Sequence, residues 1–174
     1  RLPGVHTHLH ISNTAAVAER VRAGLADLGF VGKLPESPDL LATSFIDDAI
    51  VLAVPADHAF ASRTSVSLPE LFEQRLIGRE AGSGTRETVE SRLSEADRAA
   101  LARAAFLELG STHAVIASIA DGAGIGFVSL RAIVERGKRD VVVVPIDGLD
   151  IRRDLYMIRR RDKGDQPLLR IFVD

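Results

Sequence analysis

The alternation of apolar and polar residues near the start of the chain predicts a strand. The apolar residues of segment 5–11 alternate with three histidines, so one face of this strand is apolar and the other polar. Residues 12–14 are polar and suit a helix cap, and apolar residues recur at helical spacing over 17–28. We therefore expect a strand, a turn and a helix that ends at Gly29, followed by a short strand at residues 30–31.

The middle of the chain carries two apolar runs with strand character. Residues 40–46 and 49–55 are separated by Asp47-Asp48, which predicts two strands joined by a tight connection. Residues 67–70 read Ser-Leu-Pro-Glu, the spacing of a capping box with proline in the first turn. A short helix through Phe72 is expected there.

Strands and helices alternate through the rest of the chain. The patterns predict strands at residues 75–79, 106–109, 125–128, 141–146 and 151–158, and helices at residues 86–93, 113–120, 130–136 and 167–173. This alternation is typical of an α/β fold with mostly parallel strands. Ligands in such folds bind at the carboxyl ends of strands.

Size and charge narrow the possible functions. The 174 residues form one ordinary domain, or two small lobes sharing one core, and 46% hydrophobic with 26% charged residues is typical of a soluble globular protein. Twenty-two Lys and Arg against 24 Asp and Glu give a net charge of -2, which provides no general attraction to DNA or anionic membranes. The longest apolar runs are far shorter than the roughly 20 residues of a membrane helix.

The chain offers no motif for catalysis, a metal or a cofactor. It has no cysteine, which excludes disulfides and thiol chemistry, and His58 and His113 have no partners spaced as in a catalytic triad. His6, His8 and His10 share one face of the predicted strand, but no further ligand is tied to them by a known spacing. The glycines of segment 122–126 lie between a helix and a strand, the reverse of a dinucleotide fingerprint. We expect no enzyme activity, no metal and no cofactor.

One glycine-rich turn is a candidate anion site. Gly82-Ser83-Gly84-Thr85-Arg86 follows a predicted strand and opens a helix, so free N–H groups and hydroxyls can meet a carboxylate or another anion. An ordinary capped turn explains the same residues. The spacing is neither that of a Walker loop nor that of a nucleophile elbow, so Ser83 is not expected to be a nucleophile.

Two further turns have the same character. Ser12-Asn13-Thr14 and Ser111-Thr112 each lie between a predicted strand and a helix. Each alone is explained by helix capping. Together with the glycine-rich turn they predict a polar pocket for a small, anionic molecule.

Three segments resemble the effector-binding domain of LysR-type transcriptional regulators, and in particular the branch that regulates sulfur, nitrogen and carbon assimilation. They read LPGVHTHLHISNTAAVAERVRAGLADLGFVG, LIGREAGSGTRETVESRL and LELGSTHAVIASIADGAGIGFVS, and they occur in the family's order. The resemblance runs through nearly the whole chain. It implies a type 2 periplasmic-binding-protein-like fold, in which two Rossmann-like lobes are joined by two crossover strands.

The resemblance also implies lobe boundaries and a site. Lobe I would comprise residues 1–52 and 153–174, and lobe II residues 53–152. A small effector would lie between the lobes. The residues that match the family's effector contacts are Ser12, Asn13, Thr14, Gly84, Thr85, Ser111 and Thr112.

The family's domain begins with a further strand and helix ahead of residues 3–5, and this unit is absent from the sequence. We expect it either upstream or replaced by a partner chain. The family's DNA-binding helix-turn-helix domain also lies upstream, so DNA would be bound only through that absent part.

The resemblance implies a cytoplasmic homodimer or tetramer that senses a small metabolite and controls transcription. The alternative is an exported solute-binding protein of the same fold, and a small-molecule enzyme on this fold has no catalytic residue to support it.

Overall fold

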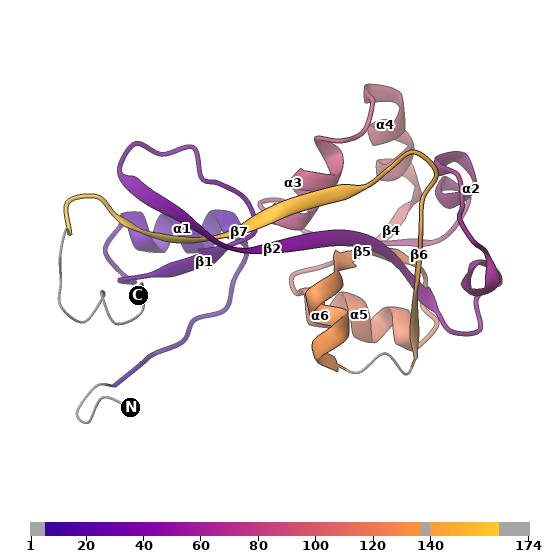
Figure 1. Cartoon of the computed structure of the whole chain (residues 1–174), viewed down its shortest axis with the longest axis horizontal. Coiled ribbons are helices and arrows are strands. Elements are labelled where there is room, and N and C mark those ends of the chain that lie inside the picture. The colour runs from indigo at the N-terminus through magenta and orange to yellow at the C-terminus, as the bar shows by residue number, and fades with distance from the viewer. Residues whose placement is uncertain (1–5, 137–139, 164–174) are drawn as a thin grey trace.

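The computed structural model describes residues 6–136 and 140–163 of the chain (Figure 1). Helix α1 (Thr14–Arg22) and strand β1 (Gly29–Val31) lie at one end of an elongated molecule, and helices α2 to α6 lie at the other. The long strands β2 (Leu40–Pro55) and β7 (Ile151–Arg160) run side by side between the two ends.

The main sheet is antiparallel, in contrast to the expectation of mostly parallel strands. Its order is β1-β7-β2-β5, where β5 spans Gly126–Ser129. Strand β6 (Val141–Val144) also pairs with the end of β2, on the edge of β2 opposite β5. Parallel pairing occurs between β3 (Leu76–Arg79) and β4 (Ala105–Leu109), and at isolated bridges that join β3 to Ile125 and Val66 to Ile146. The prediction was wrong because the two crossover strands, β2 and β7, pair antiparallel with each other and with their neighbours, and they make most of the backbone hydrogen bonds of the sheet.

Strand β2 is continuous, so the expected tight connection at Asp47-Asp48 was wrong. The β2–β7 register runs from Leu40 opposite Arg160 to Ile50 opposite Ile151, with one irregularity between Ser44 and Ile46. Asp48 is tolerated in the middle of this buried strand because Arg153 of β7 pairs with its carboxylate.

Helices cover both faces of the sheets in the larger end. Helices α3 (Gly84–Glu90) and α4 (Glu95–Ala104) lie on one side of the long strands, and α5 (Thr112–Ala120) and α6 (Leu130–Arg136) lie on the other (Figure 1). Helix α2 (Leu68–Phe72) has the predicted capping box, and a 3₁₀ helix spans Ala59–Ser62. No helix among the described residues is long and apolar enough to cross a membrane.

The predictions for the first 30 residues need correction, and helix α4 was missed. Residues 6–13 form no strand, and Leu9 is 84% exposed, because the described residues give this segment no strand to pair with. Helix α1 ends before Gly24, at φ 72°, and Gly29 instead begins β1 as its first residue. Helix α4 was not predicted: its apolar residues are alanines and a single leucine, Leu101, which packs on the core without being fully buried. The predicted helix at residues 167–173 lies outside the described residues.

Each end of the molecule has its own core. In the larger end, one cluster forms beneath α4 around Leu52, Leu71 and Leu76, and a second forms beneath α5 around Ile77 and Ile119. In the smaller end, a cluster joins α1 to β1 and the adjoining parts of β2 and β7; its buried members are Val21, Val31, Leu40 and Ile158. The crossover strands therefore connect two separately packed bodies.

Candidate functional site

Three helix starts meet at a cavity of about 210 Å³ between the two ends of the molecule. The middle of β2 and β7 forms its base. Its lining residues are Ser12, Asn13, Thr14, Phe30, Val31, Gly32, Phe45, Arg79, Ser83, Gly84, Thr85, Thr112, Arg153 and Leu155. Six of the seven predicted site residues lie on this cavity. Ser111 does not line it and instead precedes α5 as its N-cap residue, without a side-chain capping bond.

The start of α1 is held against the glycine-rich turn. Asn13 caps the helix by accepting a hydrogen bond from the Ala16 amide at 2.9 Å, and its amide nitrogen donates to the Ala81 carbonyl at 3.3 Å. The Ala15 amide donates to the Gly82 carbonyl at 3.2 Å, and Gly82 has a φ of 80°. Backbone and side-chain bonds thus join the two turns directly.

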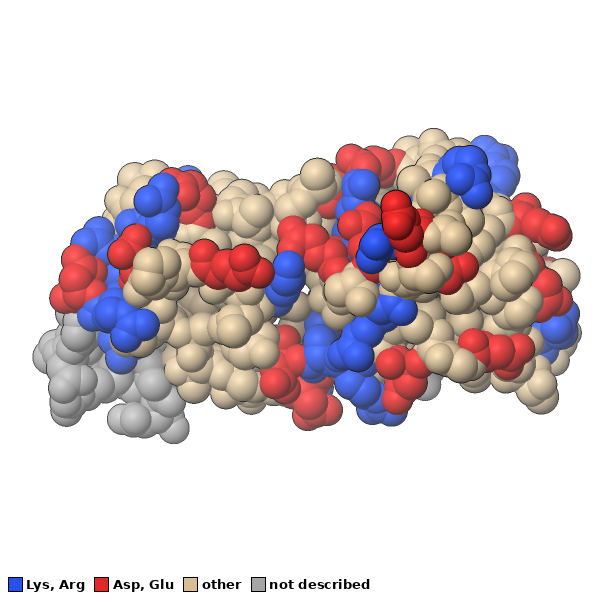
Figure 2. Space-filling model, turned by 90° about the horizontal axis from the view of Figure 1, so that it is seen from above, with Lys and Arg blue, Asp and Glu red and all other residues tan. Residues whose placement is uncertain are grey.

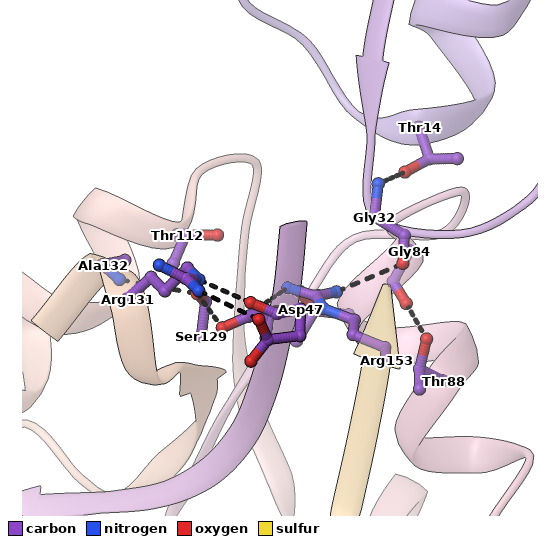
Figure 3. Close-up of polar contacts among 12 residues, drawn as sticks. Thr14, Gly32, Asp47, Gly84, Thr88, Thr112, Ser129, Arg131, Ala132 and Arg153 are labelled. Atoms are coloured by element: carbon purple, nitrogen blue, oxygen red, sulfur yellow. Dashed lines mark hydrogen bonds and ion pairs between the residues drawn. The ribbon is translucent and has the colours of Figure 1, made fainter. Parts of the chain in front are cut away.

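Gly84 lets α3 approach the smaller end closely. A Cβ there would lie 2.6 Å from Thr14 Oγ1 and 3.0 Å from the Gly32 carbonyl carbon, so no larger residue fits without movement. Thr14 Oγ1 accepts a hydrogen bond from the Gly32 amide at 3.4 Å (Figure 3). The close contact is therefore a specific role for glycine at this helix start.

Arg153 connects the cavity to both crossover strands. Its Nε and Nη2 donate to Asp48 Oδ2 at 3.0 and 2.8 Å, and its Nη1 donates to Thr85 Oγ1 at 3.1 Å. Ser129 donates to the other oxygen of the Asp48 carboxylate at 3.0 Å. Figure 3 shows Arg153 between β2 and the start of α3. The side chains of Arg153 and Asp48 are 9% and 0% exposed, so this charge pair is buried.

Arg79 occupies the other side of the cavity, at the end of β3. Its Nη1 donates to Thr112 Oγ1 at 2.6 Å, while Nε and Nη2 donate to the carboxylate of Glu80 at 2.8 and 3.0 Å. These bonds hold the pKa of Glu80 below its usual value, against the opposing effect of burial. Arg79 thereby fixes the position of the Thr112 hydroxyl.

The charge of the lining favours an anion. It contains two guanidinium groups, several hydroxyls and amide groups, and no carboxylate. Each arginine already has a carboxylate partner behind the lining, so the hydroxyls and helix-start N–H groups complete the polar surface.

Sequence reasoning missed Arg79 and Arg153. Neither lies in a glycine- or hydroxyl-rich turn, and Arg153 is 105 residues from its partner Asp48. The available signal was Asp48 itself, because a carboxylate beside a run of buried strand residues requires a cationic partner.

The histidines expected to share a strand face do not form a site. His6, His8 and His10 are exposed on an irregular segment. No group of three or more potential metal ligands occurs among residues 6–136 and 140–163.

Comparison with known proteins identifies the family. The family described as "LysR substrate binding domain" matches residues 1–174. The HTH-type transcriptional activator CmpR of Synechocystis is 30% identical over 173 residues, which are 99% of this chain and 56% of CmpR. The phosphonates import ATP-binding protein PhnC of Anaeromyxobacter dehalogenans is 35% identical over 174 residues, which are 99% of this chain and 34% of PhnC.

A solved structure shares the fold. The regulatory domain of Synechocystis CcmR, in complex with 2-PG, matches with a TM-score of 0.83 and 29% identity, covering 99% of this chain and 82% of that one. This chain spans about half the length of CmpR. The family match supports a domain of a LysR-type regulator over the alternative, an exported solute-binding protein of the same fold. The chain belongs to the LysR substrate-binding domain family and is an effector-binding domain with the periplasmic-binding-protein-like fold.

Proposed function

We propose that the cavity binds a small anionic metabolite and that the bound state controls transcription by the whole protein. The observation that carries this proposal is the composition of the lining: six predicted helix-start residues and two largely buried arginine side chains, with no carboxylate. A helix N-terminus and an arginine both stabilise negative charge in a partly dry site.

The ligand we favour is a short phosphorylated carboxylate. A cavity of about 210 Å³ is smaller than the pockets that hold drug-sized molecules, and it suits a metabolite of a few carbon atoms. The CcmR regulatory domain, 29% identical to this chain, was solved with 2-phosphoglycolate. Arg79 and Arg153 remain paired with Glu80 and Asp48, so the hydroxyls and helix-start N–H groups of the lining would donate to the anionic groups of the ligand.

The signal would arise from the relative position of two lobes. We assign residues 1–52 and 153–174 to lobe I and residues 53–152 to lobe II, so Thr14 and Thr85 approach the ligand from different lobes. A ligand that binds one arrangement of the lobes more tightly shifts the protein toward that arrangement. The chain itself performs no chemical reaction in this proposal.

The remaining partners follow from the family. DNA would be bound by a helix-turn-helix domain outside this sequence, in a cytoplasmic homodimer or tetramer. On the face shown in Figure 2, acidic and basic side chains are interspersed, which agrees with a domain that does not itself hold DNA.

Titration calorimetry with 2-phosphoglycolate tests the site. Thr85→Val removes the hydroxyl while keeping the shape of the side chain, and we expect its affinity for 2-phosphoglycolate to be at least about 10-fold lower than that of the wild type. Thr88→Val is the matched control, because Thr88 lies one turn further along α3, outside the cavity lining, and its hydroxyl donates to the Gly84 carbonyl.

Equal affinities of the wild type and Thr85→Val would remove Thr85 from the site. If 2-phosphoglycolate does not bind, other small molecules, namely dicarboxylates and phosphate esters, are titrated next under the same conditions. Failure of all of them would contradict the anion site itself.

A further inference from the structure

A second cavity lies on the α3 and α4 side of the larger end. Its volume is about 280 Å³, and it is formed between these two helices and strands β3, β4 and β5. Its lining residues are Leu76, Ile77, Gly78, Arg79, Thr85, Arg86, Val89, Glu90, Leu101, Ala102, Ala105, Phe106, Leu107, Glu108, Gly126 and Phe127. None of the predicted turns at residues 12–14 or 111–112 takes part.

The interior of this second cavity is apolar. Phe106 and Phe127 lie on the strand side, and Val89 and Leu101 close it from the helices. Gly78 leaves the floor open, because a Cβ built there meets no atom nearer than the Leu107 carbonyl oxygen at 4.0 Å. The cavity opens to solvent where Ala102, Ala105 and Phe106 are exposed, so a ligand can enter it without movement of the core.

The charged groups at the second cavity satisfy one another. Arg86 donates from Nε to Glu90 at 2.8 Å and from Nη1 to Glu108 at 2.7 Å. It also donates from Nη1 to the carbonyl of Arg79 at 3.2 Å. The bonds to Glu90 are the main reason that the pKa of Arg86 is raised. An anionic ligand would have to displace one of two carboxylates, whereas a neutral ligand leaves this network intact.

We propose that the second cavity binds a small, neutral aromatic molecule. One or two fused rings fit its volume, and the rings of Phe106 and Phe127 offer favourable contacts to an aromatic ring, although the Arg75 guanidinium already stacks on Phe106 at 4.1 Å from the ring centroid. An aromatic molecule would bury apolar surface against Val89, Leu101 and Phe127, which favours binding. This ligand differs in charge and polarity from the anion of the first cavity, and the proposal does not depend on that anion.

The two cavities share a wall. Arg79 and Thr85 line both of them, so a substitution at either residue would affect both sites. Gly78 lines the second cavity and not the first, which makes it the residue to change. Its φ is not in the left-handed region, so a side chain there adds volume without backbone strain.

The test measures binding of 5-fluoroindole to the whole protein by fluorine NMR. We expect binding to the wild type and a Kd at least 10-fold higher for Gly78→Leu, whose side chain fills the floor. Gly110→Leu is the matched control, because a Cβ at Gly110 meets nothing within 4 Å and Gly110 lines neither cavity. The melting temperature of Gly78→Leu should be at or above that of the wild type.

Ala102→Leu fills the same cavity from α4 at an exposed position, and it must give the same loss even if Gly78→Leu fails to fold. Indole-3-acetate should bind at least 10-fold more weakly than 5-fluoroindole. The proposal is overturned by no binding of 5-fluoroindole at about 1 mM. Equal binding by the wild type and the filled variants, or equal binding of the anionic probe, would overturn it as well.

Discussion

Arg153 of β7 donates its two shortest hydrogen bonds to the same carboxylate oxygen of Asp48 on β2, from Nε at 3.0 Å and from Nη2 at 2.8 Å. The remaining nitrogen, Nη1, reaches Thr85 at the start of α3. A single buried guanidinium therefore joins the two crossover strands to a wall of the cavity. A movement of the cavity wall at Thr85 or of strand β2 at Asp48 would therefore alter the position of this side chain.

Replacing Asp48 should destabilise the protein strongly. Asp48→Asn keeps the size of the side chain but leaves the buried charge of Arg153 without its counter-ion, and we expect a loss of about 3 kcal/mol in the free energy of unfolding. Urea denaturation at neutral pH measures this loss.

Asp150→Asn is the control for Asp48→Asn. Asp150 pairs with Arg152 on the same strand region, but both side chains are 74% exposed, so we expect almost no change in stability. A loss for Asp48→Asn as small as that of the control would show that the buried pair does not stabilise the fold.

Gly84→Ala should separate α3 from the smaller end. The new Cβ would lie 3.0 Å from the Gly32 carbonyl carbon and 3.2 Å from the Lys33 amide nitrogen, and these backbone atoms must move. We expect a destabilisation of about 1–3 kcal/mol, together with weaker binding of 2-phosphoglycolate. Thermal denaturation and calorimetry measure the two effects.

Gly110→Ala is the matched change in open space, because its Cβ would meet nothing within 4 Å. It should leave both stability and ligand affinity close to the wild type. Wild-type behaviour of Gly84→Ala would contradict the close approach of Thr14 to α3.

Acid should weaken the Arg79–Glu80 pair. Since the folded-state pKa of Glu80 lies below its usual 4.5, the pair stabilises the protein above pH 4.5 and loses this effect as the pH falls through the folded-state pKa. The stability difference between the wild type and Glu80→Gln should therefore be largest near neutral pH and shrink below about pH 4. Urea denaturation across this pH range measures it.

The exposed Glu73→Gln is the control for the pH series. Its stability difference from the wild type should vary less with pH than that of Glu80→Gln. A difference for Glu80→Gln that grows as the pH falls would have the wrong sign and would reject the role of this pair.

Local signals in the sequence were enough for several elements and for part of the site. The capping box of α2 needs only Ser67 and Glu70, which lie three residues apart, and both of its bonds form. Likewise the glycine-rich turn and the hydroxyls at Thr14 and Thr112 are helix starts that can be recognised from neighbouring residues. These residues of the site could therefore be predicted from the local sequence pattern of a helix start.

Distant partners explain the failures. Asp47-Asp48 has the composition of a turn, and the contacts with Arg153 and Ser129, far along the chain, allow Asp48 to lie within a strand. The alternating residues 5–11 have strand composition, but a strand also needs a neighbour to bond with. Arg153 was missed at the site for the same reason, since its partner Asp48 is 105 residues away. Arg79 pairs with the adjacent Glu80, and only its bond to Thr112, 33 residues away, connects it to another of the predicted turns.

The ion pair between Lys33 and Glu87 joins the segment after β1 to α3 and should depend on salt. Lys33 Nζ lies 2.8 Å from Glu87 Oε2, and the side chains are 43% and 36% exposed. The hydrogen bond to Glu87 raises the pKa of Lys33. We expect a coupling of about 0.5 kcal/mol in a double-mutant cycle of Lys33→Met and Glu87→Gln at low salt, falling toward zero at about 1 M salt.

The pair of Asp48 with Arg153 is the control. Its coupling energy, measured with Asp48→Asn and Arg153→Met, should be nearly unchanged at about 1 M salt because the pair is buried. If the coupling of Lys33 with Glu87 survived equally well, the pair would not be the solvent-screened contact that its exposure indicates.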